Sequence, residues 1–211
     1  MKKLFLFANL IVAMSLIGTA VNAQALSAKK IEKEAKKQAK VLVKEGWITA
    51  PGKQSVEMQQ LKSLQMQNTY DENFSPKFYM GSGQSVGPNY DAAKFQATEL
   101  AKIDIAGMIS SDIAGIVETN IANQQMDPGQ AAAITKSVGA YKSFVAAKLT
   151  NIISAVDMYK TDSKTGNATA QIIVFYNKDE AIKAGIQAVR DELMKESQEL
   201  GKELDKLLQS K

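Results

Sequence analysis

The sequence predicts an α+β domain in which a small antiparallel sheet of about three strands packs against long helices, with extra helices at both ends. Three observations carry this prediction. Residues 91–122 hold the longest apolar periodicity at helical spacing, residues 151–176 have the composition of a β-hairpin, and the segment from Phe78 starts like a strand. Because a sheet has to bury one face, we expect the helices at 91–122 and 130–149 to cover it.

Residues 1–23 have the three parts of a secretory signal peptide: a basic start, the apolar run 4–17 and a small-residue end. The run is shorter than the about 20 residues that span a bilayer, so cleavage is expected after Ala23 or Ala25. The chain has no Cys, which excludes a lipoprotein anchor and disulfides. We expect an exported protein in the periplasm or at the surface of a bacterium, neither membrane-spanning nor lipid-anchored.

Composition limits the chemistry of the mature chain. The formal charge of +4 falls to +2 without Lys2 and Lys3, too little to predict nucleic-acid binding. No His is present, which excludes His-based triads and His-ligated zinc. We predict no catalytic residue, no cofactor and no metal site. The enzyme alternative pairs a carboxylate such as Asp157 or Asp104 with a lysine, although Asp157 is expected to point outward from its strand.

Residues 24–76 are predicted to form an N-terminal helical extension. Its first helix ends near Gly46, Trp47 begins a short extended piece, and residues 55–68 form a second helix. The first helix combines an apolar stripe with seven lysines: Lys29, Lys30, Lys33, Lys36, Lys37, Lys40 and Lys44. We interpret the lysines as a solvated face, since Glu32, Glu34 and Glu45 dilute the charge. The alternative is binding to an anionic membrane surface.

The core domain is predicted at 77–195. Its first strand contains Gly81 and Gly83, an order similar to a nucleotide-binding loop. However, a Rossmann loop requires a second strand with an acidic residue after the helix, and a Walker loop requires Gly-Lys-Ser or Gly-Lys-Thr. Both are absent. The glycines are expected to let the strand leave the sheet or approach a helix closely. The following helix is predicted to bury a broad apolar stripe that includes Leu100, Ile103 and Ile116, and a turn at Gly166 to join the two hairpin strands.

The last helix is predicted to start at a capping box after Asn177 and to run some thirty residues. Its end, residues 196–211, is a charged amphipathic helical tail with a leucine seam that includes Leu200, Leu204 and Leu207. We expect the seam to pack on its own domain, against the N-terminal helix. The alternative is a homo-oligomer in which the seam pairs with a second copy.

Residues 77–195 resemble the bacterial envelope family typified by the Lpp-twenty lipoprotein and the N-terminal domain of flagellar assembly protein T. The resemblance rests on a strand with a Gly-x-Gly step (81–83), a hydrophobic strand ending in an aromatic residue (152–159), a returning strand (171–176), and an alanine-rich helix with Ala92, Ala93, Ala97, Leu100 and Ala101. It implies a small α/β domain in the envelope and no catalytic residue.

These features predict an exported, non-catalytic envelope protein that acts through interaction with an envelope protein partner. The alternative is a small-ligand or glycan-binding module at the surface or in the periplasm. Its candidate site residues stack on or approach the ligand closely: Trp47, Tyr79, Gly81, Gly83 and Tyr90.

Overall fold

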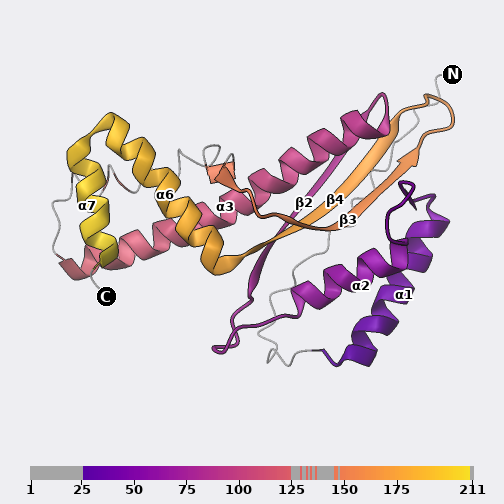
Figure 1. The fold of residues 1–211 in the computed structure, drawn as a ribbon, viewed down its shortest axis with the longest axis horizontal. Coiled ribbons are helices and arrows are strands. Elements are labelled where there is room, and N and C mark those ends of the chain that lie inside the picture. The colour runs from indigo at the N-terminus through magenta and orange to yellow at the C-terminus, as the bar shows by residue number, and fades with distance from the viewer. Residues whose placement is uncertain are drawn as a thin grey trace, which may run out of the picture.

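The computed structural model describes residues 26–124 and 148–209, with residues 129, 132, 134, 136, 145 and 146 between them. The predicted signal peptide and most of the predicted helix at 130–149 lie outside the described residues. The described part confirms the α+β class. It holds a four-stranded antiparallel sheet in the order β1-β3-β4-β2 (Figure 1). The strands are β1 (Ile48–Thr49), β2 (Phe78–Gly87), β3 (Ile153–Thr161) and β4 (Ala168–Asn177).

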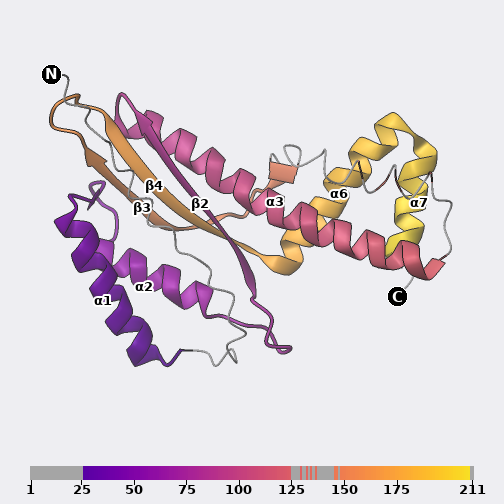
Figure 2. The ribbon, with the colours of Figure 1, turned by 180° about the vertical axis from the view of Figure 1, so that it is seen from behind.

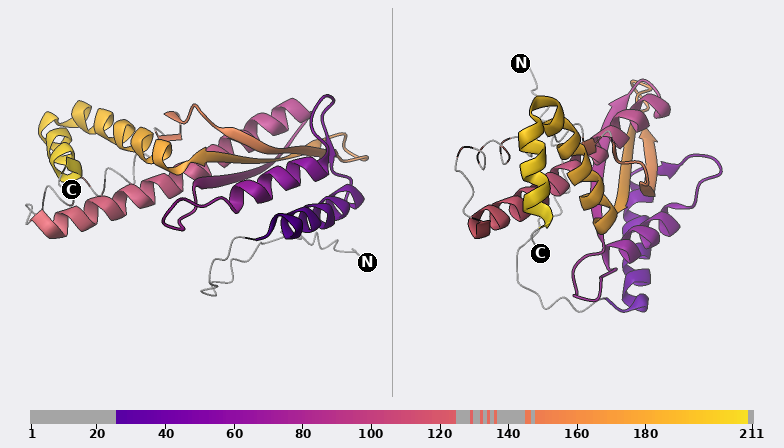
Figure 3. Two further views of the ribbon diagram at one scale, coloured as in Figure 1. Left: turned by 60° about the horizontal axis from the view of Figure 1, so that its bottom comes forward. Right: turned by 60° about the vertical axis from the view of Figure 1, so that its left-hand side comes forward.

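Helices lie on both faces of this sheet. They are α1 (Ala28–Lys44), α2 (Val56–Gln67), α3 (Tyr90–Gln124), α6 (Lys178–Glu196) and α7 (Gln198–Gln209). On one face α3 packs on β2 and β4; on the other α2 packs on β3, and α1 packs on the outside of α2 (Figure 3). The N-terminal helices therefore form a layer of the fold, and α1 is its outermost element.

Alternation along β4 explains why the sheet needs two helical layers. Ala170, Ile172, Val174 and Tyr176 belong to the core shared with α3, as their common strand face predicts. Ile173, on the opposite face, packs against the second cluster of α1, α2 and β3 side chains. Both faces of the central strand are therefore covered.

Close contact between β2 and α3 depends on glycine and alanine. A Cβ atom on Gly83 would lie 1.9 Å from the Ala97 carbonyl oxygen, and one on Gly81 would lie 2.1 Å from that of Ala101. Two strand residues advance about 6.7 Å and four helix residues about 6 Å, so the two repeats stay nearly in step. Of the two roles expected of these glycines, close approach to a helix is confirmed, and departure of the strand from the sheet is wrong, because β2 continues to Gly87.

The buried stripe of α3 is narrower than its sequence predicts. Ala93, Ala97, Ala101, Ile105, Ala106, Ile109, Ile113 and Val117 are fully buried. In contrast, Leu100, Ile103 and Ile116 are 48%, 42% and 36% exposed, so the prediction that they lie in the core is wrong. The glycines of β2 draw the alanine side of α3 against the sheet, which turns Leu100 and Ile103 away from it.

α3 also packs against α6 and α7, beyond the end of the sheet (Figure 2). The predicted continuous last helix is wrong: Ser197 is extended, with φ −156° and ψ 120°, and α7 folds back there. Leu193 and Leu204 are fully buried, and Arg190 pairs with Asp205 at 2.7 Å. The tail packs on its own domain at the end opposite α1, so the expected contact with the N-terminal helix is also wrong.

Side chains from the helices hydrogen-bond to backbone groups along the unpaired sides of β3 and β2. β1 pairs only with Met158 and Tyr159 of β3. Beyond β1, the Asp157 N–H donates to Gln59 Oε1 at 2.7 Å, and Lys62 Nζ donates to the Ser154 carbonyl at 2.7 Å. At the β2 edge, the Ser82 N–H donates to Asp104 Oδ2 at 3.1 Å. Asp104 therefore accepts a hydrogen bond from the sheet, and among the described residues it has no lysine partner of the kind that the enzyme alternative requires.

Candidate functional site

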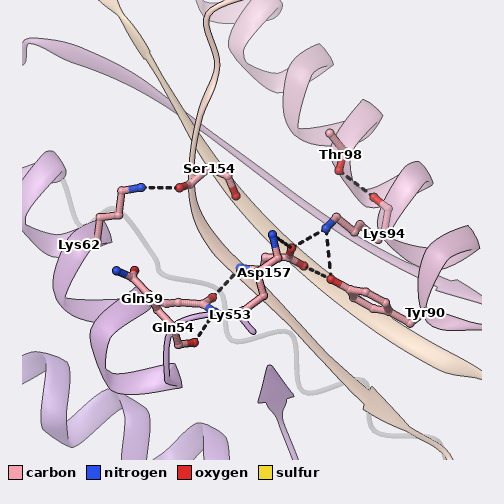
Figure 4. A network of polar contacts seen from close by, with 9 residues as sticks. All are labelled: Lys53, Gln54, Gln59, Lys62, Tyr90, Lys94, Thr98, Ser154 and Asp157. Atoms are coloured by element: carbon pink, nitrogen blue, oxygen red, sulfur yellow. Dashed lines mark hydrogen bonds and ion pairs between the residues drawn. The ribbon is translucent and has the colours of Figure 1, made fainter. Parts of the chain in front are cut away.

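A polar cluster around Asp157 is the most elaborate side-chain network in the described residues (Figure 4). Asp157 lies on β3 and is 6% exposed, so the prediction that its side chain points outward is wrong. Tyr90 OH donates to its Oδ1 at 2.6 Å, and Lys94 Nζ lies 2.6 Å from its Oδ2. Lys94 also donates to Tyr90 OH at 3.2 Å, which closes a triangle of phenol, ammonium and carboxylate.

Three elements position this cluster. Tyr90 and Lys94 lie one turn apart on α3, which places them on the same helix face. The Tyr90 ring packs on the Tyr159 ring, with centroids 4.6 Å apart. The main chain of Asp157 is held from the opposite helical layer by Gln59, whose Nε2 donates to the Gln54 carbonyl at 2.9 Å. The network thus links α3, β3 and α2.

The protonation states follow from these contacts. Burial, with the hydrogen bond to Asp157, raises the pKa of Tyr90 to about 12. Burial acts to lower the pKa of Lys94, but its hydrogen bonds to Asp157 and Tyr90 outweigh that effect and raise it. At neutral pH the phenol keeps its proton and the amine stays charged. Neither is a ready base or nucleophile, and both carboxylate oxygens are occupied.

A second cluster of the same three residue types lies elsewhere on the α3 face of the sheet. Tyr79 OH on β2 donates to Asp112 on α3, and Lys178 at the start of α6 pairs with Asp112 at 3.2 Å. Lys178 Nζ lies 5.4 Å from the centroid of the Tyr79 ring, as Lys94 Nζ lies 5.3 Å from that of Tyr90. Burial and the bond to Asp112 raise the pKa of Tyr79. The two clusters fasten α3 to the sheet at two places.

These shifts predict how the protein responds to alkali. Since the folded pKa of Tyr90 lies above the unfolded value of about 10, its contribution to stability is complete below pH of about 10 and is lost as the pH rises toward 12. In a spectrophotometric titration, the Tyr79 and Tyr90 phenols should ionise above a pH of about 10, as the chain unfolds. Tyr90→Phe should remove one ionisation from this part of the curve. A curve that Tyr90→Phe leaves unchanged above that pH would contradict the assignment.

The structure separates the residues predicted to bind a ligand. Trp47 is 4% exposed and packs with Val156 and Met158 on the α2 side of the sheet, where Lys160 lies over its ring at 4.7 Å. Tyr79 is 7% exposed and, like Gly81 and Gly83, lies on the α3 side. These residues do not form an exposed stacking surface, so the glycan site predicted from them is wrong.

Sequence reasoning did not identify Lys94, Asp112 or Lys178. Asp157 and Tyr90 were each named, but for separate roles, and they lie 67 residues apart. The one sequence signal that could have joined them is an acidic residue inside an otherwise apolar strand, because a buried carboxylate needs a donor or cation from a facing element.

The described residues include no group of three or more Asp, Glu, His or Cys side chains that could hold a metal ion. Nor does any helix among them have the length and hydrophobicity required to cross a membrane. One small open cleft lies between α1 and α2, lined by Glu32, Ala35, Lys36, Glu57 and Leu61. These residues take no part in the Asp157 cluster.

Comparison with known proteins gives no match: no family model, curated protein or solved structure is similar to this chain at a significant level. The resemblance to the envelope family therefore stays a prediction.

Proposed function

We propose that this chain is an exported, non-catalytic envelope protein that acts by binding another protein through the outer face of α3. The observation that carries the proposal is the exposure of Phe95, Leu100 and Ile103, which are 69%, 48% and 42% accessible. Apolar side chains of this size on one helix favour a contact with another protein surface.

The position of these side chains supports a protein partner. Phe95 lies about 200° around α3 from the buried Ala93, so it points away from the sheet. Leu100 and Ile103 are three residues apart and therefore neighbours on the helix surface. Glu99, four residues from both Phe95 and Ile103, lies between them on the helix surface and pairs with Lys102 at 2.8 Å. The exposed face of α3 therefore combines aromatic, aliphatic and charged side chains, as protein interfaces do.

The chemistry of the rest of the chain agrees with a binding role. The Asp157 cluster uses its donors and acceptors internally, and the shifts of Tyr90 and Lys94 hold both groups away from reactive states near neutral pH. The predicted signal peptide and the envelope-family resemblance support the same compartment.

The test compares two variants of the chain recovered from the bacterial envelope. Phe95→Ala/Leu100→Ala/Ile103→Ala should weaken binding of the partner identified by cross-linking by about 30-fold or more, the effect of losing an interface hot spot. The control is Phe74→Ala, because Phe74 is 78% exposed in the loop before β2. It should bind like the wild type.

Three results would contradict the proposal. They are equal binding by both variants, wild-type chain that cross-links to no defined partner, and specific substrate turnover by the purified chain. Circular dichroism and thermal melting of each variant should match the wild type, since the three side chains lie outside the core.

A further inference from the structure

All seven lysines of α1 point to the same side of the helix. At 3.6 residues per turn, they fall within an arc of about 120°. All seven side chains are exposed. The buried residues Ile31, Ala35 and Ala39 lie on the opposite side and pack against α2 and the cluster around Trp47. α1 is the outermost helix of the N-terminal layer (Figure 3), and the lysine face, as we call this arc, is exposed on it.

The acidic residues of α1 do not interrupt the lysine face. Glu32 and Glu34 lie about 40° outside its two margins, between the lysines and the buried side. The margins themselves carry Val43 and Val41, which are 57% and 50% exposed. The dilution of charge expected from the sequence is thus absent from the lysine face, which combines unbroken positive charge with apolar margins.

The lysine face works against the stability of its own helix. Four pairs at i,i+4 spacing are both lysine, such as Lys29 with Lys33, and like charges at this spacing repel. The first turn holds Lys29 and Lys30 and no acidic residue, where the helix dipole disfavours cations. Some lysines elsewhere, such as Lys94, Lys102 and Lys178, have carboxylate partners within 4 Å, and these seven have none among the described residues.

Charge is also divided unevenly between α1 and the remainder of the chain. Seven lysines against two glutamates give α1 a charge of +5. The whole chain carries +4, of which Lys2 and Lys3 contribute +2, so residues 24–211 outside α1 carry −3. The field of the mature chain therefore directs α1, and not the body of the domain, toward an anionic surface.

We propose that the lysine face binds the surface of an anionic phospholipid bilayer, with α1 lying parallel to it. Lysines in a row act as point charges that need no fixed partner geometry, which suits a layer of mobile headgroups. Val41 and Val43 reach the interface at either margin. A nucleic-acid surface is favoured less, because α1 contains no Arg for bidentate phosphate contacts and no aromatic residue for stacking on bases.

This arrangement is compatible with the proposed protein contact and independent of it. α1 lies on the α2 side of the sheet, and α3, which includes Phe95, lies on the other side (Figure 1). A chain resting on a bilayer through α1 would still present α3 to a partner.

The experiment is flotation of the exported chain with vesicles of phosphatidylcholine, with and without phosphatidylglycerol. Binding should require phosphatidylglycerol and should disappear when salt rises from about 0.1 M to about 1 M, as the screening length falls from about 10 Å to about 3 Å. Lys29→Gln/Lys33→Gln/Lys37→Gln/Lys40→Gln removes the centre of the lysine face. Each lysine near the surface contributes about fivefold to the vesicle partition coefficient, so this variant should bind more weakly, by on the order of 100-fold or more.

The matched control removes the same number of charges elsewhere: Lys77→Gln/Lys164→Gln/Lys183→Gln/Lys202→Gln. These four lysines are exposed and lie outside α1. The control should retain most of the vesicle binding. The α1 variant should melt at or above the wild-type temperature, because like-charge pairs have been removed, so lost binding would not reflect unfolding.

Any of three results would overturn the proposal: no binding to anionic vesicles at low salt, equal loss in both variants, or tighter binding to DNA or an acidic polysaccharide than to the vesicles. None of them bears on the α3 contact, because the Phe95 variants keep every lysine.

Discussion

Gly83→Ala should lower the free energy of unfolding by about 3 kcal/mol or more, a large share of the about 5–15 kcal/mol that stabilises a typical domain. The added methyl group would lie 1.9 Å from the Ala97 carbonyl oxygen and 2.9 Å from the Ala101 nitrogen. Both are backbone atoms within α3, so no side chain can rotate away. Relief requires α3 to move off the sheet, which opens the core. Urea denaturation followed by circular dichroism measures the change.

Gly115→Ala is the matched control. Gly115 is an exposed residue of the same helix, and nothing lies within 4 Å of the position of its added Cβ. This variant should stabilise the protein by about 0.5–1 kcal/mol, because alanine is the better helix former. If Gly→Ala destabilises the protein at Gly83 and stabilises it at Gly115, the steric contact with α3 accounts for the loss at Gly83, and backbone propensity does not. A wild-type midpoint for Gly83→Ala would mean that β2 and α3 are further apart than described.

Asp157→Asn should cost about 2 kcal/mol, because it leaves a partly buried ammonium without its counterion. The cost stays below that of a fully buried pair, since the Lys94 side chain is 34% exposed and can turn toward water. Tyr90→Phe removes a donor to the same carboxylate. In a double-mutant cycle, the two changes should couple by about 1 kcal/mol, measured by urea denaturation at neutral pH.

Asp104→Asn is the control for the loss of one carboxylate. Asp104 is exposed and accepts a hydrogen bond from the Ser82 N–H, a role that an amide oxygen can fill. Its cost should be within about 0.5 kcal/mol. Additive effects of Asp157→Asn and Tyr90→Phe would contradict the description of one linked network.

The parts of the fold that the sequence predicted well have long, regular patterns. The apolar repeat of α3 and the strand–turn–strand of β3 and β4 are examples, and Gly166 adopts the positive φ of 73° expected of a turn glycine. The short extended piece predicted from Trp47 is confirmed as the two-residue β1, but so short a segment does not indicate that it pairs with β3. The leucine repeat keeps the same period on both sides of Ser197, so the spacing of the leucines does not indicate the break between α6 and α7.

The site was less predictable because its members meet only in the folded chain. Lys94 and Asp157 are 63 residues apart, and Asp112 and Tyr79 are 33 apart. The prediction that Tyr79 and Trp47 bind a ligand depends on their residue type alone. Which ring is covered depends on the pairing of strands and on which helix crosses each face, and neither can be read from local sequence.

The occupied edges of the sheet matter for a chain that is predicted to be exported. Free edge strands template the stacking of further strands into cross-β aggregates. Here Gln59, Lys62 and Asp104 hold edge groups of β3 and β2 once the helices have docked. Docking of α2 and α3 therefore buries a core and also occupies backbone groups with which strands of other copies could pair. The surfaces that remain available to other molecules are helical.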